Sequence, residues 1–218
     1  MAIIEAVNLS KSYGESTSIV KAVDRITCAF EDHGLTVITG KSGSGKSTFL
    51  RLLALLEHPD SGEVYLDGEN ITALNDEQKS AIRRERFGFV YQDFNLLSEY
   101  TVKDNILLPV YLSNQTVPFE RFERLTEFLN IDQLLERRPH ELSGGQKQRA
   151  AIARAMINRP DILFADEPTG NLDSENARSV FQLFKQIAAS GQSVIMVTHD
   201  EDLAGDADRT IVIKDGRI

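Results

Sequence analysis

The eight residues that begin at Gly40 and end at Ser47 constrain the fold of this 218-residue chain more than any other feature. They read Gly-Lys-Ser-Gly-Ser-Gly-Lys-Ser and match the pattern G-x-x-x-x-G-K-[ST] at every fixed position. A strand-like apolar run at 35–39 precedes them and a helical pattern at 46–57 follows, which is the context that this motif requires. The motif therefore predicts an α/β fold with a nucleoside-triphosphate site, whereas the same letters without that context would describe a Gly/Ser-rich turn.

The chemistry of this phosphate loop assigns a part to its residues. Glycines let the backbone curl around a phosphate with its N–H groups pointing inward, and the helix N-terminus adds a partial positive charge. Lys46 can reach the β- and γ-phosphates, and the hydroxyl of Ser47 can ligate Mg²⁺. The residues that we expect to hold the nucleotide here are Gly40, Ser42, Gly43, Ser44, Gly45, Lys46, Ser47 and Thr48.

Composition narrows the class of protein. Acidic residues number 33 and basic residues 24, which gives a net charge of −9. We expect no nucleic-acid partner, because a broad nucleic-acid surface normally needs a basic excess. The one cysteine, Cys28, permits no disulfide within the chain and lies in a strand-like run, so we interpret it as a small buried apolar residue. The N-terminus lacks a signal-peptide pattern, and no window approaches the roughly 20 apolar residues of a membrane span.

Short apolar strands alternate with helices, which predicts an α/β domain with a largely parallel core sheet. The runs at 35–39, 162–165 and 194–197 are almost unbroken, as expected of central parallel strands. Between about 93 and 158 only helical patterns occur, so we expect one domain, 1–218, with a helical subdomain (93–158) inserted into an α/β core (1–92 and 159–218). Strands are expected at 2–9, 26–30, 35–39, 63–66, 88–91, 161–165, 193–198 and 209–214, and helices at 46–57, 77–86, 102–108, 120–129, 144–158 and 174–190.

Two adjacent carboxylates, Asp166 and Glu167, close the apolar run at 162–165. Placing carboxylates at the end of a buried strand costs free energy unless they are paired or bind a ligand, so a functional role is indicated. We expect Asp166 to hold Mg²⁺ and Glu167 to polarise the attacking water as a general base. His199 closes another apolar strand; a lone histidine is more often structural, but beside these motifs we expect it to reach the γ-phosphate.

A second helix suited to anions follows the sequence Leu-Ser-Gly-Gly-Gln-Lys-Gln-Arg at 142–149. Ser143 can cap that helix, and two glycines leave its first turn bare. One chain needs a single γ-phosphate site. A second such surface makes sense if it completes the site of a partner molecule.

These motifs, in this order, resemble the ABC ATPase family over nearly the whole chain. The resemblance implies a P-loop fold of the ABC type, with a mostly parallel core sheet, an N-terminal antiparallel β part and the inserted α-helical subdomain. It also implies that Tyr13 stacks on adenine, although a turn aromatic is the alternative, and that Gln92 ligates Mg²⁺ and senses the γ-phosphate. His199 resembles the switch histidine of the family, and Asn-Leu-Asp at 171–173, which contains Asp173, resembles the loop that couples the two sites across the dimer.

The family further implies how such a chain works. Two copies enclose two ATP molecules head to tail, and hydrolysis reopens the dimer. Each ATP touches the phosphate loop of one copy and the signature residues of the other, which here are Ser143, Gly144, Gly145 and Gln146. The implied catalytic residues are Lys46, Gln92, Glu167 and His199, and the implied metal ligands are Ser47, Gln92 and Asp166.

The implied partners are integral membrane permease subunits on separate chains, which would hold this chain at the cytoplasmic face of the inner or plasma membrane. The stretches 89–97 and 165–173 are similar to the branch that contains the lipoprotein-releasing, macrolide-exporting and cell-division ATPases. The insert at 15–22 looks more like the lipoprotein and macrolide exporters. We therefore expect a role in export or extraction of a lipoprotein, peptide or drug.

Two details concern the surface of the chain. A groove bounded by 93–97 and 81–86 is where a transporter would dock, and Phe94, Leu96 and Leu97 either contact the transporter or fill the subdomain core. Lys41 places a positive charge at the second position of the phosphate loop, where many relatives carry another residue, and we expect no loss of function from it.

Two other functions compete with this hypothesis. The first is a cell-division ATPase that switches envelope hydrolases without transport. The second is a soluble ABC ATPase acting on DNA or ribosomes, which is disfavoured because such proteins typically carry two nucleotide domains, long coiled-coil insertions or zinc modules, and this sequence shows none.

Overall fold

Two β-sheets form the framework of the computed structural model, which describes residues 2–14, 19–113, 116 and 119–218. One sheet is parallel, in the strand order β6-β7-β8-β3-β9, and the other is antiparallel, in the order β2-β1-β4-β5. This confirms the predicted fold class, including the N-terminal antiparallel part. The strands are β1 (Ala2–Tyr13), β2 (Val20–Glu31), β3 (Gly34–Thr39), β4 (Ser61–Leu66), β5 (Glu69–Asn70), β6 (Phe87–Tyr91), β7 (Ile162–Asp166), β8 (Ser193–Val197) and β9 (Arg209–Val212).

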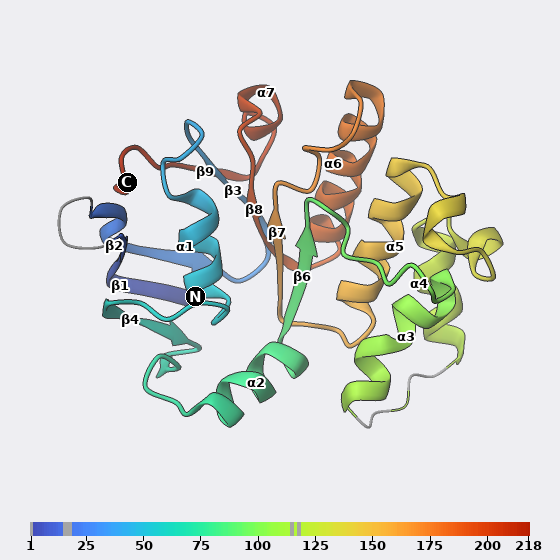
Figure 1. Ribbon diagram of the computed structural model, residues 1–218, viewed down its shortest axis with the longest axis horizontal. Helices are drawn as coiled ribbons and strands as arrows, with labels where there is room; N and C mark the ends of the chain where they lie inside the picture. Colours follow the sequence, from blue (N-terminus) through green and yellow to red (C-terminus); the bar gives the residue numbers. More distant parts are fainter. Residues whose placement is uncertain (1, 15–18, 114–115, 117–118) are drawn as a thin grey trace.

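Helices cover both faces of the parallel sheet, as its apolar strands require. The helices are α1 (Lys46–Leu53), α2 (Asp76–Glu85), α3 (Val102–Ser113), α4 (Phe119–Phe128), α5 (Gly144–Met156), α6 (Ser174–Ala189) and α7 (Glu201–Ala204), with 3₁₀ turns at Asp132–Leu134 and Pro139–Glu141. Helix α1 lies between the two sheets, whereas α6 and then α5, α3 and α4 lie on the other side of the parallel sheet (Figure 1).

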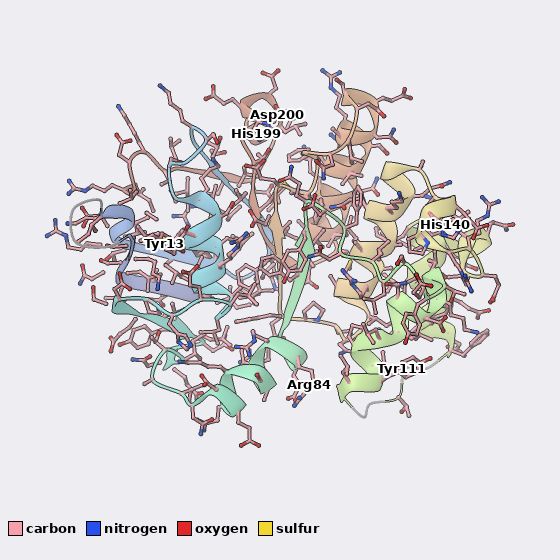
Figure 2. All side chains as sticks on the ribbon, viewed as in Figure 1. Tyr13, Arg84, Tyr111, His140, His199 and Asp200 are labelled. Carbon is pink, nitrogen blue, oxygen red and sulfur yellow. The ribbon has the colours of Figure 1, made fainter. Side chains whose placement is uncertain are left out.

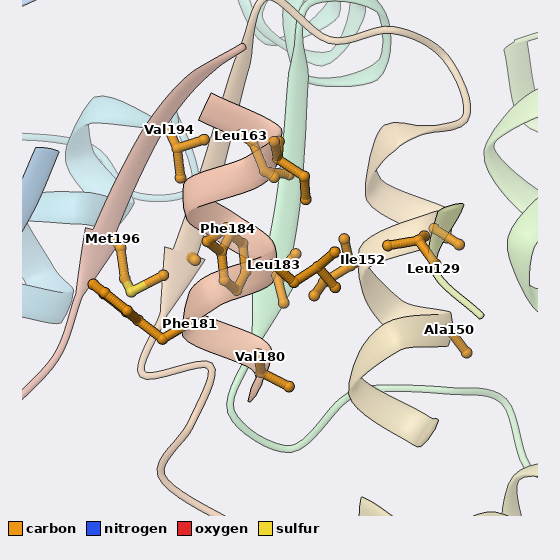
Figure 3. Packing of buried hydrophobic residues seen from close by; sticks show 14 of the residues in the cluster. Leu129, Ala150, Ile152, Leu163, Val180, Phe181, Leu183, Phe184, Val194 and Met196 are labelled. Carbon is orange, nitrogen blue, oxygen red and sulfur yellow. The ribbon is translucent and has the colours of Figure 1, made fainter. Parts of the chain in front are cut away.

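Strand β7 shows why the central strands are continuously apolar. Ile162 and Phe164 point into the core that α1 shares with the antiparallel sheet, while Leu163 and Ala165 point into the core under α5 and α6. In that second core, Phe181 and Phe184 of α6 pack on the sheet (Figure 3). Every side chain of β7 is buried, so the strand delivers Asp166 to a fixed place at the carboxyl edge of the sheet.

The element boundaries differ from the predicted ones where the backbone turns unexpectedly. Helix α1 ends at Leu53, not at 57, because Leu55 adopts a left-handed backbone with φ of 56°. Helix α3 continues through Pro109 to Ser113, although the pattern stopped it at 108. The short elements β5 and α7 were not predicted, and both are too short to leave a periodic pattern.

The structure also bears on the expectations about Cys28, membrane-spanning segments and the inserted subdomain. Cys28 is partly buried against the core of the antiparallel sheet, and burial raises the pKa of its thiol to about 12, which fits an unreactive apolar residue. Within the described residues no helix is long and apolar enough to cross a membrane. Residues 15–18 of the predicted insert lie outside the described residues, and the division into a core and an inserted subdomain stays a prediction.

Candidate functional site

The phosphate loop joins β3 to α1 and has a shape that its glycines make possible. A Cβ on Gly40 would lie 2.1 Å from the carbonyl oxygen of Ile213, and one on Gly45 would lie 1.8 Å from that of Ala22. Gly45 also caps α1 in a left-handed conformation (φ 102°) without a side-chain hydrogen bond. The first N–H groups of α1 therefore have no acceptor from a capping side chain.

Two polar side chains of the loop are buried at its centre. Lys46 is 4% exposed, and its Nζ donates to the carbonyl oxygens of Gly40 and Lys41, at 2.9 and 3.0 Å. The hydroxyl of Ser44 is buried and has no hydrogen-bond partner among the described residues. A buried ammonium, an unsatisfied hydroxyl and an uncapped helix end together fit a chain of phosphates.

Asp166 and Ser47 meet at the carboxyl edge of the sheet. The Ser47 hydroxyl donates to Oδ1 of Asp166 at 2.6 Å, and Asp166 is 7% exposed. A hydroxyl and a carboxylate are oxygen ligands of the kind that Mg²⁺ prefers, so the pair fits this ion. Arg51, which lies 3.5 Å from the other carboxylate oxygen, was not singled out in the sequence; its position one helical turn after Ser47 was the available signal.

Glu167 and His199 form the second polar pair of this edge. Nδ1 of His199 lies 2.7 Å from Oε2 of Glu167, and Figure 2 places His199 beside Asp200 on the same edge of the molecule as the phosphate loop. Glu167 has a left-handed backbone (φ 47°), with its N–H donating to the carbonyl of Val197 at 3.0 Å. A non-glycine residue held in this region stores strain, which is frequent at functional sites.

Gln92 lies next to this edge, after β6, and is tied to the loop that follows Glu167. Its side-chain Nε2 donates to Oδ1 of Asn171 at 3.2 Å, and Asn171 in turn donates to Asp93 at 2.8 Å. Tyr91, just before it, pairs in register with Asp166 of β7. Gln92 is thus held near the predicted metal site through neighbouring strands, with its amide engaged by Asn171.

An arginine of α5 shapes the segment after Gln92 and was missed in the sequence. Phe94 and Asn95 both have positive φ, and the guanidinium of Arg154 donates to their carbonyl oxygens. Burial lowers the pKa of Arg154. Because Lys147 and Arg149 are basic residues of the same helix, nothing in the sequence distinguished Arg154 for this role.

The signature residues lie at the start of α5, on the far side of the parallel sheet from α1 (Figure 1). Ser143 caps the helix: its Oγ accepts from the N–H of Gln146 at 3.3 Å, and its own N–H donates to Oε1 of Gln146 at 3.0 Å. Gly144 and Gly145 lie against the loop and first turn of α6, where a Cβ would approach Leu172 at 3.0 Å and Asn176 at 2.6 Å. The predicted site residues therefore form two groups rather than one.

Asp173 belongs to the second group. It caps α6, its Oδ1 accepting from the N–H of Asn176 at 2.9 Å and its Oδ2 from the Asn176 amide at 2.7 Å. These hydrogen bonds hold the pKa of Asp173 below its usual range. The loop from 170 to 173 therefore runs from Gln92, beside the phosphate-loop group, to the signature group.

Tyr13 ends β1 near the first turn of α1. It is 43% exposed, its hydroxyl donates to Glu57, and the Nζ of Lys11 lies 5.7 Å from its ring centre. Burial and the bond to Glu57 raise its pKa, whereas Thr48 lowers it. An aromatic face with exposed area beside the loop suits a nucleobase.

A groove of about 510 Å³ lies at the opposite edge of the molecule, where Figure 2 shows Arg84 and Tyr111. Arg83 and Arg84 of the predicted stretch line it. Phe94, Leu96 and Leu97 do not, and Leu96 packs on the core instead. Its lining residues are Ala54, Leu56, Ser80, Arg83, Arg84, Phe87, Gly88, Phe89, Tyr91, Leu108, Pro109, Leu112, Arg154, Ala155 and Asn158.

Comparisons of the sequence with protein families and with individual relatives all point to ABC transporter proteins. The family model described as "ABC transporter" matches residues 23–170. The macrolide export ATP-binding/permease protein MacB of Chlorobaculum tepidum is 42% identical over 98% of this chain, which spans 33% of that relative's length. The lipoprotein-releasing system ATP-binding protein LolD of Psychrobacter arcticus is 41% identical over 99% of this chain and 97% of its own length.

Solved structures resemble the whole chain. A dimeric structure of MJ0796, a bacterial ABC transporter cassette, superposes with a TM-score of 0.88 at 36% identity and covers 99% of this chain and 96% of its own. A dimeric post-hydrolysis state of MJ0796 bound to ADP and Pi gives a TM-score of 0.88 at 35% identity, with the same shares covered.

Proposed function

Because this chain belongs to the ABC transporter family, as an ATP-binding and ATP-hydrolysing subunit, we propose that two copies of it close head to tail around two ATP molecules and thereby drive separate membrane subunits. The observation that carries the proposal is the placement of two anion-binding helix ends, α1 and α5, on opposite sides of the parallel sheet. Neither end alone encloses a triphosphate. A two-fold rotation brings the α5 end of one copy onto the α1 end of the other.

The α1 side is proposed to bind ATP first. Lys46 and the N–H groups of Gly40 and of residues 42–48 would hold the phosphates, and Tyr13 would carry the adenine. In closing, Ser143, Gly144, Gly145 and Gln146 of the partner copy would contact the γ-phosphate, with Asp173 beside them. Dimeric solved cassettes of the same fold support a dimer.

Hydrolysis is assigned to the polar pairs at the carboxyl edge of the sheet. Glu167 would accept a proton from the attacking water. His199, whose Nδ1 lies 2.7 Å from Oε2 of Glu167, would hold this carboxylate in place and face the γ-phosphate. Mg²⁺, held by Ser47, Asp166 and Gln92, would supply electrophilic stabilisation of the phosphates. The Nε2 of Gln92 donates to Asn171, which leaves its Oε1 available for Mg²⁺.

The groove lined by Arg84 and Arg154 is proposed to receive the membrane subunits. It is largely apolar, and it lies opposite the edge that carries His199 (Figure 2). Such a partner would keep the chain at the cytoplasmic face of the membrane. The likeness to MacB and LolD supports export or extraction of a drug, peptide or lipoprotein.

A single substitution tests the dimer and the general base together. Glu167→Gln keeps the size and the capacity to bond His199 but removes the base, so ATP hydrolysis should fall by about 10²- to 10⁴-fold. With ATP and Mg²⁺ the variant should elute from size-exclusion chromatography as a stable dimer, while the parent cycles and elutes mainly as a monomer. The control is Glu127→Gln, which changes an exposed acid of α4 and should leave hydrolysis close to that of the parent.

The outcomes separate the parts of the proposal. A variant that hydrolyses ATP at the parental rate would show that Glu167 is not the base. Loss of hydrolysis without a dimer would keep the assignment of the base but contradict closure of the isolated chains, so that closure would have to depend on the membrane subunits.

A further inference from the structure

Lys41 is a charged residue of the phosphate loop that the proposed site does not use. Its backbone is fixed, because its carbonyl oxygen accepts from Nζ of Lys46 at 3.0 Å and from the N–H of Ser44 at 3.1 Å. Its side chain is exposed and forms no hydrogen bond or ion pair with any residue that the structure describes. The loop thus presents a second ammonium on its outside, while Lys46 lies buried within.

The surface proposed to cover this loop carries an acid that is similarly unpaired. The first turns of α5 and α6 touch, since a Cβ on Gly145 would lie 2.6 Å from Asn176, so whatever faces Ser143 also faces the start of α6. Both carboxylate oxygens of Asp173 are occupied by Asn176. Glu175, two residues on, is exposed and makes no ion pair or side-chain hydrogen bond within the described part of the chain.

We propose that Lys41 of one copy pairs with Glu175 of the partner subunit when the two copies close on ATP. The inference rests on the proposed head-to-tail dimer and adds the contact that sets its register. Each copy carries a net charge of −9, so two copies repel at long range. An opposite-charge pair at the rim, present twice because of the two-fold axis, offsets this repulsion locally and favours the correct approach.

The pair is tested by charge exchange in the Glu167→Gln background, where ATP and Mg²⁺ hold the dimer. Sedimentation velocity over a range of protein concentrations gives the dimer dissociation constant. Lys41→Glu and Glu175→Lys should each weaken the dimer about ten- to a hundredfold, because each turns two attractions into two repulsions. The double variant, Lys41→Glu with Glu175→Lys, should recover most of the parental constant, and all effects should shrink at high salt.

Two controls keep a local role of Lys41 apart from the contact. Lys103→Glu makes the same charge change on an exposed lysine of α3 and should leave the dimer unchanged. Binding of a fluorescent ATP analogue to the Lys41→Glu chain, measured at concentrations where the chain is monomeric, should match the parent within about threefold.

Each outcome of these measurements leads to a different conclusion. Dimers unaffected by Lys41→Glu, or weakened without recovery in the double variant, would overturn the pairing while leaving the ATP dimer in place. A large loss of ATP-analogue binding by the monomer would overturn it in favour of a direct contact between Lys41 and the nucleotide. A Glu167→Gln chain that does not dimerise with ATP and Mg²⁺ would instead contradict the proposed closure of the isolated chains, and the pairing with it.

Discussion

The two helix ends that face anions are built in opposite ways. At α1 the capping residue is Gly45, which has no side chain, so the first N–H groups are left for a ligand. At α5 the capping residue is Ser143, which forms a capping box with Gln146 and thereby satisfies the N–H of Gln146 internally. The difference suggests an order of events: α1 can bind phosphate in a single copy, whereas α5 must exchange an internal bond for an external one and does so on closure.

Among the changes at the two helix ends, removal of the Lys46 ammonium at α1 should have the largest effect, and this effect should fall on ATP binding by the monomer. Lys46→Ala deletes a buried charge-assisted donor, and ATP affinity of the monomer should fall by about 100-fold. Titration of a fluorescent ATP analogue measures this, with Lys103→Ala as the matched control. An affinity within about threefold of the parent would show that α1 does not dominate binding in the single copy.

Removing the serine cap of α5 should have an intermediate effect, which on the nucleotide side is limited to the closing of the dimer. Ser143→Ala should destabilise the fold by about 1 kcal/mol through the lost cap. In the Glu167→Gln background the ATP-bound dimer should weaken by about tenfold, while ATP binding by the monomer stays unchanged. Thermal unfolding, ligand titration and sedimentation give the three values.

A matched control exists in α2, where Asn75 and Gln78 form the same kind of capping box away from the nucleotide. Asn75→Ala should cost similar stability without weakening the dimer. If both variants weakened the dimer equally, the effect of Ser143 would be one of general stability and the proposed order of events would fail.

The smallest effect concerns Asp173, which caps the neighbouring helix α6. The Asn176 hydrogen bonds depress its pKa in the folded chain, so ionised Asp173 stabilises the folded state above the unfolded-state pKa, and this contribution is lost as the pH falls through the depressed value. Carbon chemical shifts of the carboxyl group should give a pKa below 3.8, the ordinary value. Asn176→Ala should return the pKa toward that value, and an ordinary pKa in the parent would contradict the capping role.

Much of the fold could be predicted because the decisive patterns are local. Burial on both faces makes β7 an unbroken apolar run, and the Gly-rich loop, the signature and the Asp-Glu pair are each continuous in sequence. The failures involve backbone and tertiary effects that no pattern records. Leu55 ends α1 early through its left-handed conformation, and Pro109 is tolerated inside α3.

The geometry of the candidate site was less accessible. Asp166 and Glu167 were identified as neighbours in sequence, but the left-handed backbone of Glu167 and its contact with His199 depend on two strands meeting at one edge. Arg154, which holds the segment after Gln92 from a distant helix, left no distinctive signal. Contacts between segments far apart in the chain are set by packing, which a single sequence does not display.

The central claim is that each ATP site is built from two copies of the chain. It can be tested most directly by mixing two variants, each of which is defective in a different half of the site. In the Glu167→Gln background, one chain carries Lys46→Ala and the other carries Ser143→Arg, and each alone should fail to dimerise with ATP and Mg²⁺. In a mixed dimer one site combines the intact Lys46 of one copy with the intact Ser143 of the other, so sedimentation with one chain labelled should show ATP-dependent mixed dimers. A mixture that behaves as the sum of its separate chains would contradict the head-to-tail site.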